Sequence, residues 1–236
     1  MNSKEKIICI IRNVIFILCL AFSIFSVLVF LIKSKFDSFA LALVTVALIF
    51  VPDIICRIFR CRMNTVAYIA MLIYALCPLL GHSYKLYYII PCFDKILHTV
   101  GGFAFAMLGS YIVLIIQKAG KPSLLLRALF ALCFSMALSM VWEFFEYFGD
   151  MWFCQDMQAD TVIYSINSHM LGGGLGDIGR IEKIESVIIN GIPMEGYIDI
   201  GLIDTMNDML VETAGAIIYF LWLMIDRDRH PIWKRT

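Results

Sequence analysis

Six long apolar runs constrain this chain more than any other feature of its sequence. They cover about residues 7–32, 38–56, 65–82, 96–116, 124–148 and 204–225. A bilayer core about 30 Å thick is crossed by roughly 20 apolar residues in a helix. Helices also bond all their backbone polar groups internally, as lipid requires. The sequence therefore predicts an all-α polytopic membrane protein, with six transmembrane helices in a single membrane domain over residues 1–236.

The composition supports this class and argues against a nucleic-acid partner. Hydrophobic residues make up 61% of the chain, against about 45–50% in soluble domains. Lys and Arg together number 19, as do Asp and Glu, so the net charge is zero. No basic stripe with interleaved aromatic residues is present, as a nucleic-acid-binding surface would require. The partner that the composition indicates is the lipid bilayer, and the oligomeric state stays open.

The distribution of basic residues predicts the orientation. Thirteen of the 19 Lys and Arg residues flank the runs on one side. They are Lys4, Lys6, Arg12, Arg57, Arg60, Arg62, Lys118, Lys121, Arg127, Arg227, Arg229, Lys234 and Arg235. Because basic residues concentrate on the cytoplasmic side of membrane proteins, both termini are expected in the cytoplasm.

The connection between the fifth and sixth runs, residues 151–203, is the one long loop, and it is expected on the outer side. Apolar and β-branched residues flank Asn190-Gly191, a pair typical of a two-residue hairpin turn. We expect a small β-hairpin there, lying over the outer face. Cys92 and Cys154 fall on the same side, where a disulfide and two free thiols are both compatible with the sequence.

Acidic residues mark the outer ends of three predicted helices. Asp204, Asp208 and Glu212 follow one another at intervals of four, which keeps them on one helix face. Glu212 lies about 12 Å deeper than Asp204 at 1.5 Å per residue. The fifth helix ends and the fourth begins on the same side with further polar residues on one face. These residues are Glu143, Glu146 and Asp150 in the fifth helix, and Asp94 and His98 in the fourth.

Seven carboxylates and one imidazole at three helix ends require compensation. A charged side chain costs several kcal/mol in lipid, so these faces should turn inward, where Lys95 is the obvious nearby cation. Either several acids are protonated or a bound cation neutralises them. Oxygen ligands favour Mg, Mn or Ca, and a His admits Zn or Fe. The pattern predicts a divalent metal ion held among all eight residues, and the ligand number would allow two.

Helix capping explains only part of this pattern. Asp is a common N-cap and is stabilised by the helix dipole, which accounts for Asp94 and Asp204 alone. Glu143 and Glu146 approach a helix C-terminus, where the dipole opposes them, and Glu212 lies well inside its helix. The sequence therefore favours a functional polar site. Trp142, next to Glu143, is interpreted as a packing or interface anchor.

Three stretches resemble a known family. They are "LLGHSYKLYYIIPCFDKILHTVGG", "WEFFEYFGDMWFCQDMQAD" and "GYIDIGLIDTMNDMLVETAGA". Over about residues 78–220 the chain is similar to the uncharacterised YjdF-like membrane proteins, and "DKILH" is similar to the VanZ-like proteins. The family motifs fall on Asp94/His98, Trp142/Glu143/Glu146 and Asp204/Asp208. The resemblance implies a bacterial cytoplasmic membrane and a six-helix bundle, and it implies no defined activity.

Three functions fit these observations. The first is a metal-dependent enzyme acting on a lipid or cell-envelope head group, with Glu143 or Glu146 as the general base. The second is cation binding or transport, although the inner halves of the last three helices carry no charge apart from Arg127. The third is an accessory protein whose acids and metal brace a partner-binding surface.

Overall fold

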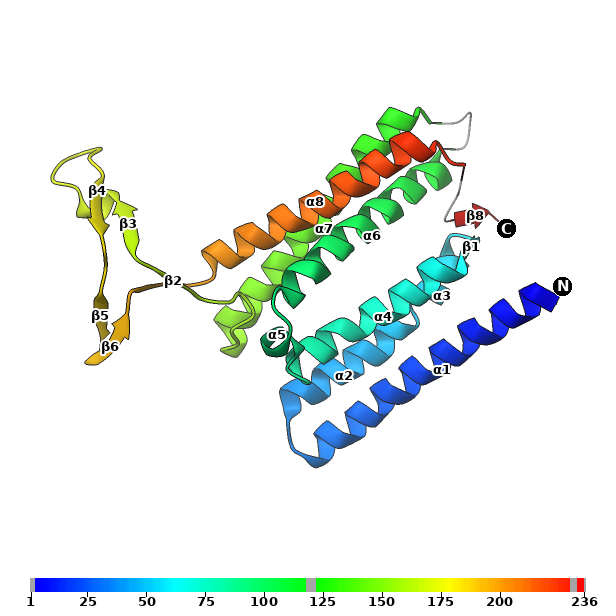
Figure 1. The fold of residues 1–236 in the computed structure, drawn as a ribbon, viewed down its shortest axis with the longest axis horizontal. Coiled ribbons are helices and arrows are strands. Elements are labelled where there is room, and N and C mark those ends of the chain that lie inside the picture. The colour runs from blue at the N-terminus through cyan, green and yellow to red at the C-terminus, as the bar shows by residue number, and fades with distance from the viewer. Residues whose placement is uncertain (1–2, 118–121, 230–232, 236) are drawn as a thin grey trace.

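Six helices long and apolar enough to cross a membrane confirm the predicted fold class (Figure 1). The computed structural model describes residues 3–117, 122–229 and 233–235, with side chains from residue 6 to residue 229. Lys118 and Lys121, assigned above to the cytoplasmic side, lie outside the described residues, as do the side chains of Lys4, Lys234 and Arg235. The helices are α1 (Ser3–Ile32), α2 (Phe36–Ile49), α3 (Val51–Ile58), α4 (Thr65–His82), α5 (Leu86–Ile89), α6 (Phe93–Ile116), α7 (Leu124–Phe153) and α8 (Leu202–Asp226).

The second span is built from two helices. α2 ends at Ile49 and α3 begins at Val51, with Pro52 in its first turn. Pro is accepted there because the first N–H groups of a helix have no intrahelical acceptor. Two other spans begin at side-chain caps, where Asn64 accepts from the Ala67 N–H and Ser123 from the Leu126 N–H. The sequence signals for helix starts therefore explain where α4 and α7 begin.

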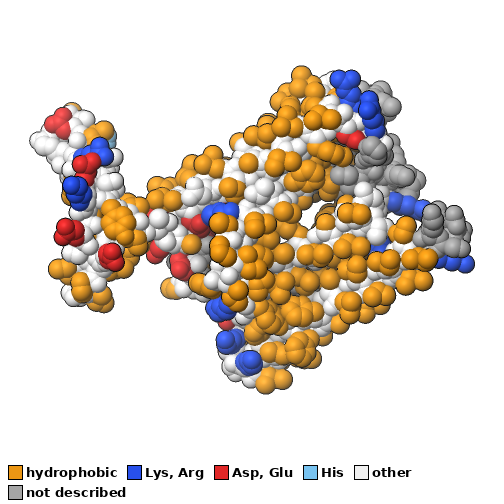
Figure 2. All heavy atoms as spheres, in the orientation of Figure 1, with side chains coloured by type: hydrophobic (Ala, Val, Ile, Leu, Met, Phe, Trp, Pro, Cys, Tyr) orange, Lys and Arg blue, Asp and Glu red, His pale blue; other side chains and the backbone are white. Residues whose placement is uncertain are grey.

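The six spans form two groups of three. α1, α2 with its continuation α3, and α4 pack together, and α6, α7 and α8 pack together, with α5 between the groups (Figure 1). The second group has a core of small and aromatic side chains that includes Ala106, Ala131 and Tyr219. Large apolar side chains cover the outward sides of both groups (Figure 2). Such a surface fits lipid contact, because soluble proteins rarely expose apolar patches of this extent.

The connection from α7 to α8 contains six short strands that form three antiparallel pairs, and it projects from the helices. Its elements are β2 (Thr161–Ile163), β3 (Ser165–Ser168), the short 3-10 helix η1 (His169–Leu171), β4 (Gly179–Glu182), β5 (Ser186–Ile189), β6 (Ile192–Glu195) and β7 (Tyr197–Asp199). β2 pairs with β7, β3 with β4, and β5 with β6. We call β3 to β6, residues 165–195, the projecting segment, and the β2–β7 pair its neck.

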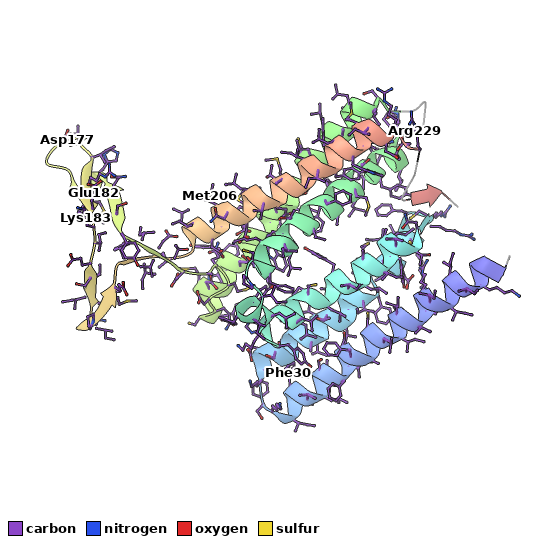
Figure 3. All side chains as sticks on the ribbon, viewed as in Figure 1. Phe30, Asp177, Glu182, Lys183, Met206 and Arg229 are labelled. Atoms are coloured by element: carbon purple, nitrogen blue, oxygen red, sulfur yellow. The ribbon has the colours of Figure 1, made fainter. Side chains whose placement is uncertain are left out.

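The predicted hairpin is confirmed in its pairing and corrected in its position. Asn190 and Gly191 both have positive φ, 49° and 85°, and connect β5 to β6, as a two-residue turn with matching twist requires. The hairpin does not lie over the outer face. It stands away from the helices (Figure 1), because the neck carries both chain segments outward before the hairpin begins. Asp177, Glu182 and Lys183 belong to this segment (Figure 3).

Both termini lie at the end of the helices opposite the projecting segment (Figure 1). There β1 (Cys61–Met63) pairs with β8 (Trp233–Arg235) and links the two helix groups. At the same end Arg127 of α7 is bonded to Asp228 by both terminal nitrogens, at 2.9 and 2.5 Å. Lys and Arg lie at this end and also where α1 meets α2, and Asp and Glu gather where α7 and α8 meet the neck (Figure 2).

A carboxylate, histidine and lysine site at the end of three helices

Two glycines let α6 and α8 approach at backbone distance. A Cβ at Gly102 would overlap the carbonyl oxygen of Glu212, and a Cβ at Gly215 would overlap that of Thr99. Small residues allow this kind of close helix contact in membranes. In both helices the polar residues lie in the turns before these glycines, so the contact places the polar face of α6 against that of α8. Met206, between the acids of α8 in sequence, is exposed on the other side of that helix (Figure 3).

Lys95 is bonded to three carboxylates at this contact. Its Nζ lies 2.5 Å from Asp204 Oδ1, 2.8 Å from both oxygens of Asp208 and 3.3 Å from Asp94 Oδ2. The second oxygen of Asp204 accepts from the backbone N–H of Ala159 at 2.9 Å. Asp204 therefore joins α6 and α8 to the loop that follows α7.

His98 lies one turn deeper among three acids. Its Nε2 is 3.7 Å from Asp94 Oδ1 and 3.8 Å from Asp208 Oδ1, and its Nδ1 is 3.5 Å from Glu212 Oε2. These distances are longer than a normal hydrogen bond, so the imidazole is surrounded by oxygens without being tightly bonded to any of them. The predicted face with Asp94, His98, Asp208 and Glu212 is thus present.

α7 adds two buried glutamates with different surroundings. Glu146 Oε1 accepts a hydrogen bond from Trp142 Nε1 at 2.8 Å, so Trp142 is more than the packing anchor that its sequence position indicated. Glu143 is 4% exposed, and neither of its oxygens has a hydrogen-bond partner among the described residues. The Thr205 hydroxyl and the charges of His98 and Asp208 are near Glu143, but the Thr205 pair lacks hydrogen-bond geometry.

The charges of this site do not balance. Six carboxylates share the site with one lysine and one histidine. The carboxylates are Asp94, Asp204, Asp208, Glu143, Glu146 and Glu212. Four of the six acids are at least nine-tenths buried: Glu143, Glu146, Asp208 and Glu212. Burying an unpaired carboxylate costs several kcal/mol. The geometry thus calls for further positive charge or for bound protons.

One subset of these residues has the arrangement of a metal site. A ligand atom from each of Asp94, His98 and Asp208 lies within 4.8 Å of the other two. Two carboxylates and an imidazole are a ligand set that suits Mn, Fe or Zn, and with added oxygens Mg. Glu212 contacts the other ring nitrogen of His98, the position from which an outer carboxylate orients a metal-bound histidine.

Asp150, predicted as part of the metal cluster, is placed differently. Its two oxygens accept from the backbone N–H groups of Met157 at 2.6 Å and Gln158 at 2.9 Å. The Gln158 side chain in turn donates to the Thr205 hydroxyl. Asp150 therefore holds the loop between α7 and the neck, and that loop covers the start of α8.

Replacing Asp150 with Ala should open this loop and leave the ligand triad intact. A hydrogen bond to a charged acceptor contributes about 1.5–3 kcal/mol, so the amides of Met157 and Gln158 should exchange hydrogen at least about tenfold faster. Hydrogen exchange with mass spectrometry measures this directly. Unchanged exchange at both amides would contradict the assigned role.

Two tyrosines near this site were missed by sequence reasoning. Tyr74 of α4 lies against α6, where a Cβ at Gly101 would be 2.6 Å from its hydroxyl oxygen, and the charges of Glu212 and Asp94 act on it. Tyr87 of α5 lies near Asp94 and Glu146. Burial and these anions raise the pKa of the Tyr87 phenol above its usual range, so it remains a neutral donor. No motif marks either residue, because both come from outside the acidic helices.

The comparisons with known proteins identify a family and no activity. The model of the family described as "Predicted membrane protein (DUF2238)" matches residues 12–229. The chain belongs to this family. The match extends over the first two spans as well, beyond the residues 78–220 that carried the resemblance above. Neither the curated proteins nor the solved structures contain a match.

Proposed function

We propose that this member of the family binds a divalent cation through Asp94, His98 and Asp208, and uses it to hydrolyse a lipid or cell-envelope head group. The observation that carries the proposal is Glu143. It is a buried carboxylate near His98 and Asp208, and both of its oxygens lack a hydrogen bond within the described part of the chain. A buried group of this kind suits a base that must be free to accept a proton.

The proposed roles follow the contacts of each residue. Asp94, His98 and Asp208 would hold the cation, Asp204 would add an oxygen, and Glu212 would orient His98. The cation would polarise a phosphoryl or carbonyl oxygen of the head group. Glu143 would take a proton from a water molecule while the oxygen of that water attacks the phosphorus or carbonyl carbon. The bond from this atom to the leaving oxygen would then break, and Glu143 would pass the proton to the leaving oxygen. Lys95, 28% exposed, would contact an anionic head group, which favours a phosphorylated substrate.

The location of the site supports a substrate delivered by the membrane. It lies at the helix ends next to the neck, where Asp and Glu gather (Figure 2), whereas 13 of the 19 Lys and Arg residues flank the spans on the other side. By the bias of basic residues toward the cytoplasm, the site faces outward and both termini face the cytoplasm.

We also propose the narrower relationship to YjdF-like and VanZ-like proteins, a bacterial cytoplasmic membrane, and one membrane domain over the whole chain.

One observation favours a second function without catalysis. Lys95 is already bonded to Asp204, Asp208 and Asp94, so an ammonium group stands among the oxygens that a metal would use. In this alternative the ion pairs brace the ends of α6 and α8, and the protein is an accessory protein that holds no cation at this site.

Metal content separates the two functions. We expect about one divalent cation per chain in the detergent-purified protein, and its loss in Asp208→Asn. Because Lys95 competes for the same oxygens, Lys95→Gln should bind the cation at least about tenfold more tightly, since each 1.4 kcal/mol of removed repulsion is tenfold in affinity. Elemental analysis and Mn²⁺ titration measure both, with the exposed loop variant Asp177→Asn as the control. No cation in any variant, with Lys95→Gln strongly destabilised, would establish the bracing function instead.

A further inference from the structure

A second polar cluster lies at the opposite end of the helices, within the first group. Arg12 of α1 donates from Nη2 to Asp53 Oδ1 of α3 at 3.0 Å, and the Tyr68 hydroxyl of α4 donates to Asp53 Oδ2 at 2.9 Å. The guanidinium carbon of Arg12 lies 3.6 Å from the centroid of the Tyr68 ring. This cluster shares no residue with the carboxylate site.

The cluster lines a cavity of about 450 Å³, which is within the usual size of small-molecule sites, about 300–1,000 Å³. Its lining residues come from α1, α3 and the first turn of α4, so the cavity lies between these three helices. Thr65, the first residue of α4, lines it. Since α4 is a membrane span that begins at Thr65, the cavity lies at the depth of lipid head groups. The other lining residues are Ile8, Cys9, Asn13 and Phe16.

Asn13 indicates that the cavity has a polar occupant. It lies inside an apolar span and is exposed, and its amide is 3.9 Å from the thiol of Cys9. A thiol at this distance is a weak partner, whereas polar groups inside membrane spans usually have strong ones. An occupant with hydrogen-bond acceptors at this position would satisfy the Asn13 N–H groups.

The cavity presents both signs of charge, which selects among lipids. Arg12 and Asn13 offer donors suited to a phosphate. Asp53 carries about four lone-pair sites as a carboxylate, of which two are used, so it can also accept from an ammonium group. A purely anionic head group would gain from Arg12 but would be repelled by Asp53.

We infer that this cavity binds the head group of an aminophospholipid, with its phosphate at Arg12 and Asn13 and its ammonium group at Asp53. The site holds a resident lipid between α1, α3 and α4 at the end that carries the termini. It acts independently of the carboxylate site, and the head group rather than the acyl chains determines the affinity.

Lipid retention on purified protein tests this inference. Dioleoyl phosphatidylethanolamine and dioleoyl phosphatidylglycerol would each be titrated into the detergent-solubilised full chain and followed by native mass spectrometry. We expect phosphatidylethanolamine to bind at least about tenfold more tightly, the ratio expected for one charge-assisted contact. Equal or tighter binding of phosphatidylglycerol would overturn the inference.

Three variants and a control locate the binding. Asp53→Asn should remove the preference for phosphatidylethanolamine, and Arg12→Gln should weaken the binding of both lipids. Asn13→Leu leaves the bonds among Arg12, Asp53 and Tyr68 in place, so it should weaken binding without lowering the melting temperature. Arg62→Gln removes a basic residue from the same end outside the cavity and should change nothing. Unchanged affinity in Asn13→Leu, a retained preference in Asp53→Asn, or an equal loss of affinity in Arg62→Gln would each show that the cavity is not the site.

Discussion

Replacing Glu143 with Gln should abolish hydrolysis and leave cation binding intact. The amide keeps the size of the side chain but accepts no proton at neutral pH, and loss of a general base lowers the rate by about 10² to 10⁴-fold. Glu143 contacts none of the three ligand residues through a hydrogen bond or ion pair given by the structure, so the cation should stay. The measurement is the turnover of phosphorylated lipid head groups by protein loaded with Mn²⁺.

The matched controls for this prediction come from the same chain. Glu146, bonded to Trp142, is the other candidate base, and Glu146→Gln should lower the rate less than Glu143→Gln does. Glu185→Gln changes an exposed acid within the projecting segment and should leave the rate unchanged. If Glu143→Gln loses the cation along with the rate, Glu143 is a ligand and the assigned base is wrong.

Replacing Gly215 with Val should unfold the contact between α6 and α8. The added Cβ alone would overlap the backbone carbonyl of Thr99 and come within 3.1 Å of the backbone nitrogen of Phe103, and backbone cannot move as a flexible side chain could. Overpacking costs about 1–3 kcal/mol and sometimes more, and this backbone collision should exceed about 3 kcal/mol. The protein should melt at a lower temperature in detergent and lose the cation, because Asp94 and Asp208 are held by the same contact.

Gly173 supplies the control for the packing prediction. It lies in the loop before β4, and a Cβ there would have no neighbour within 4 Å. Gly173→Ala should therefore change the free energy of unfolding by less than about 0.5 kcal/mol. A stable Gly215→Val protein would mean that α6 and α8 can separate without loss of the fold.

The lengths of the apolar runs predicted the number of spans and their approximate positions. They did not predict where a helix ends when polar or aromatic residues lie at its end. The fifth run was expected to end near residue 148, yet α7 continues to Phe153, because Met151, Trp152 and Phe153 are compatible with a helix at the membrane boundary. The break at Phe50 inside the second span was not predicted. Pro52 could sit in the first turn of a new helix, but apolar periodicity carries no information on such a break.

Helix periodicity predicted most of the candidate site. A spacing of four placed Asp204 and Asp208 on one face, and the same spacing placed Asp94 beside His98. It could not separate Asp150 from the other acids, because the partners of Asp150 are backbone N–H groups of the following loop. Nor could it find Tyr74, since contacts between distant helices depend on tertiary packing. The hairpin turn was predictable from Asn190-Gly191, but its separation from the helices depends on β2 and β7, which are too short to leave a pattern.

The pairing of β2 with β7 makes the outer insertion modular. Ile163 lies opposite Tyr197, so the chain leaves and returns at adjacent positions, and everything between them is joined to the helices through that pair alone in the described structure. The loop contacts of Asp150 and Asp204 fall before β2. A short turn joining residues 163 and 197 would therefore shorten the protein without disturbing the helix ends, and a foreign domain could be inserted at the same place.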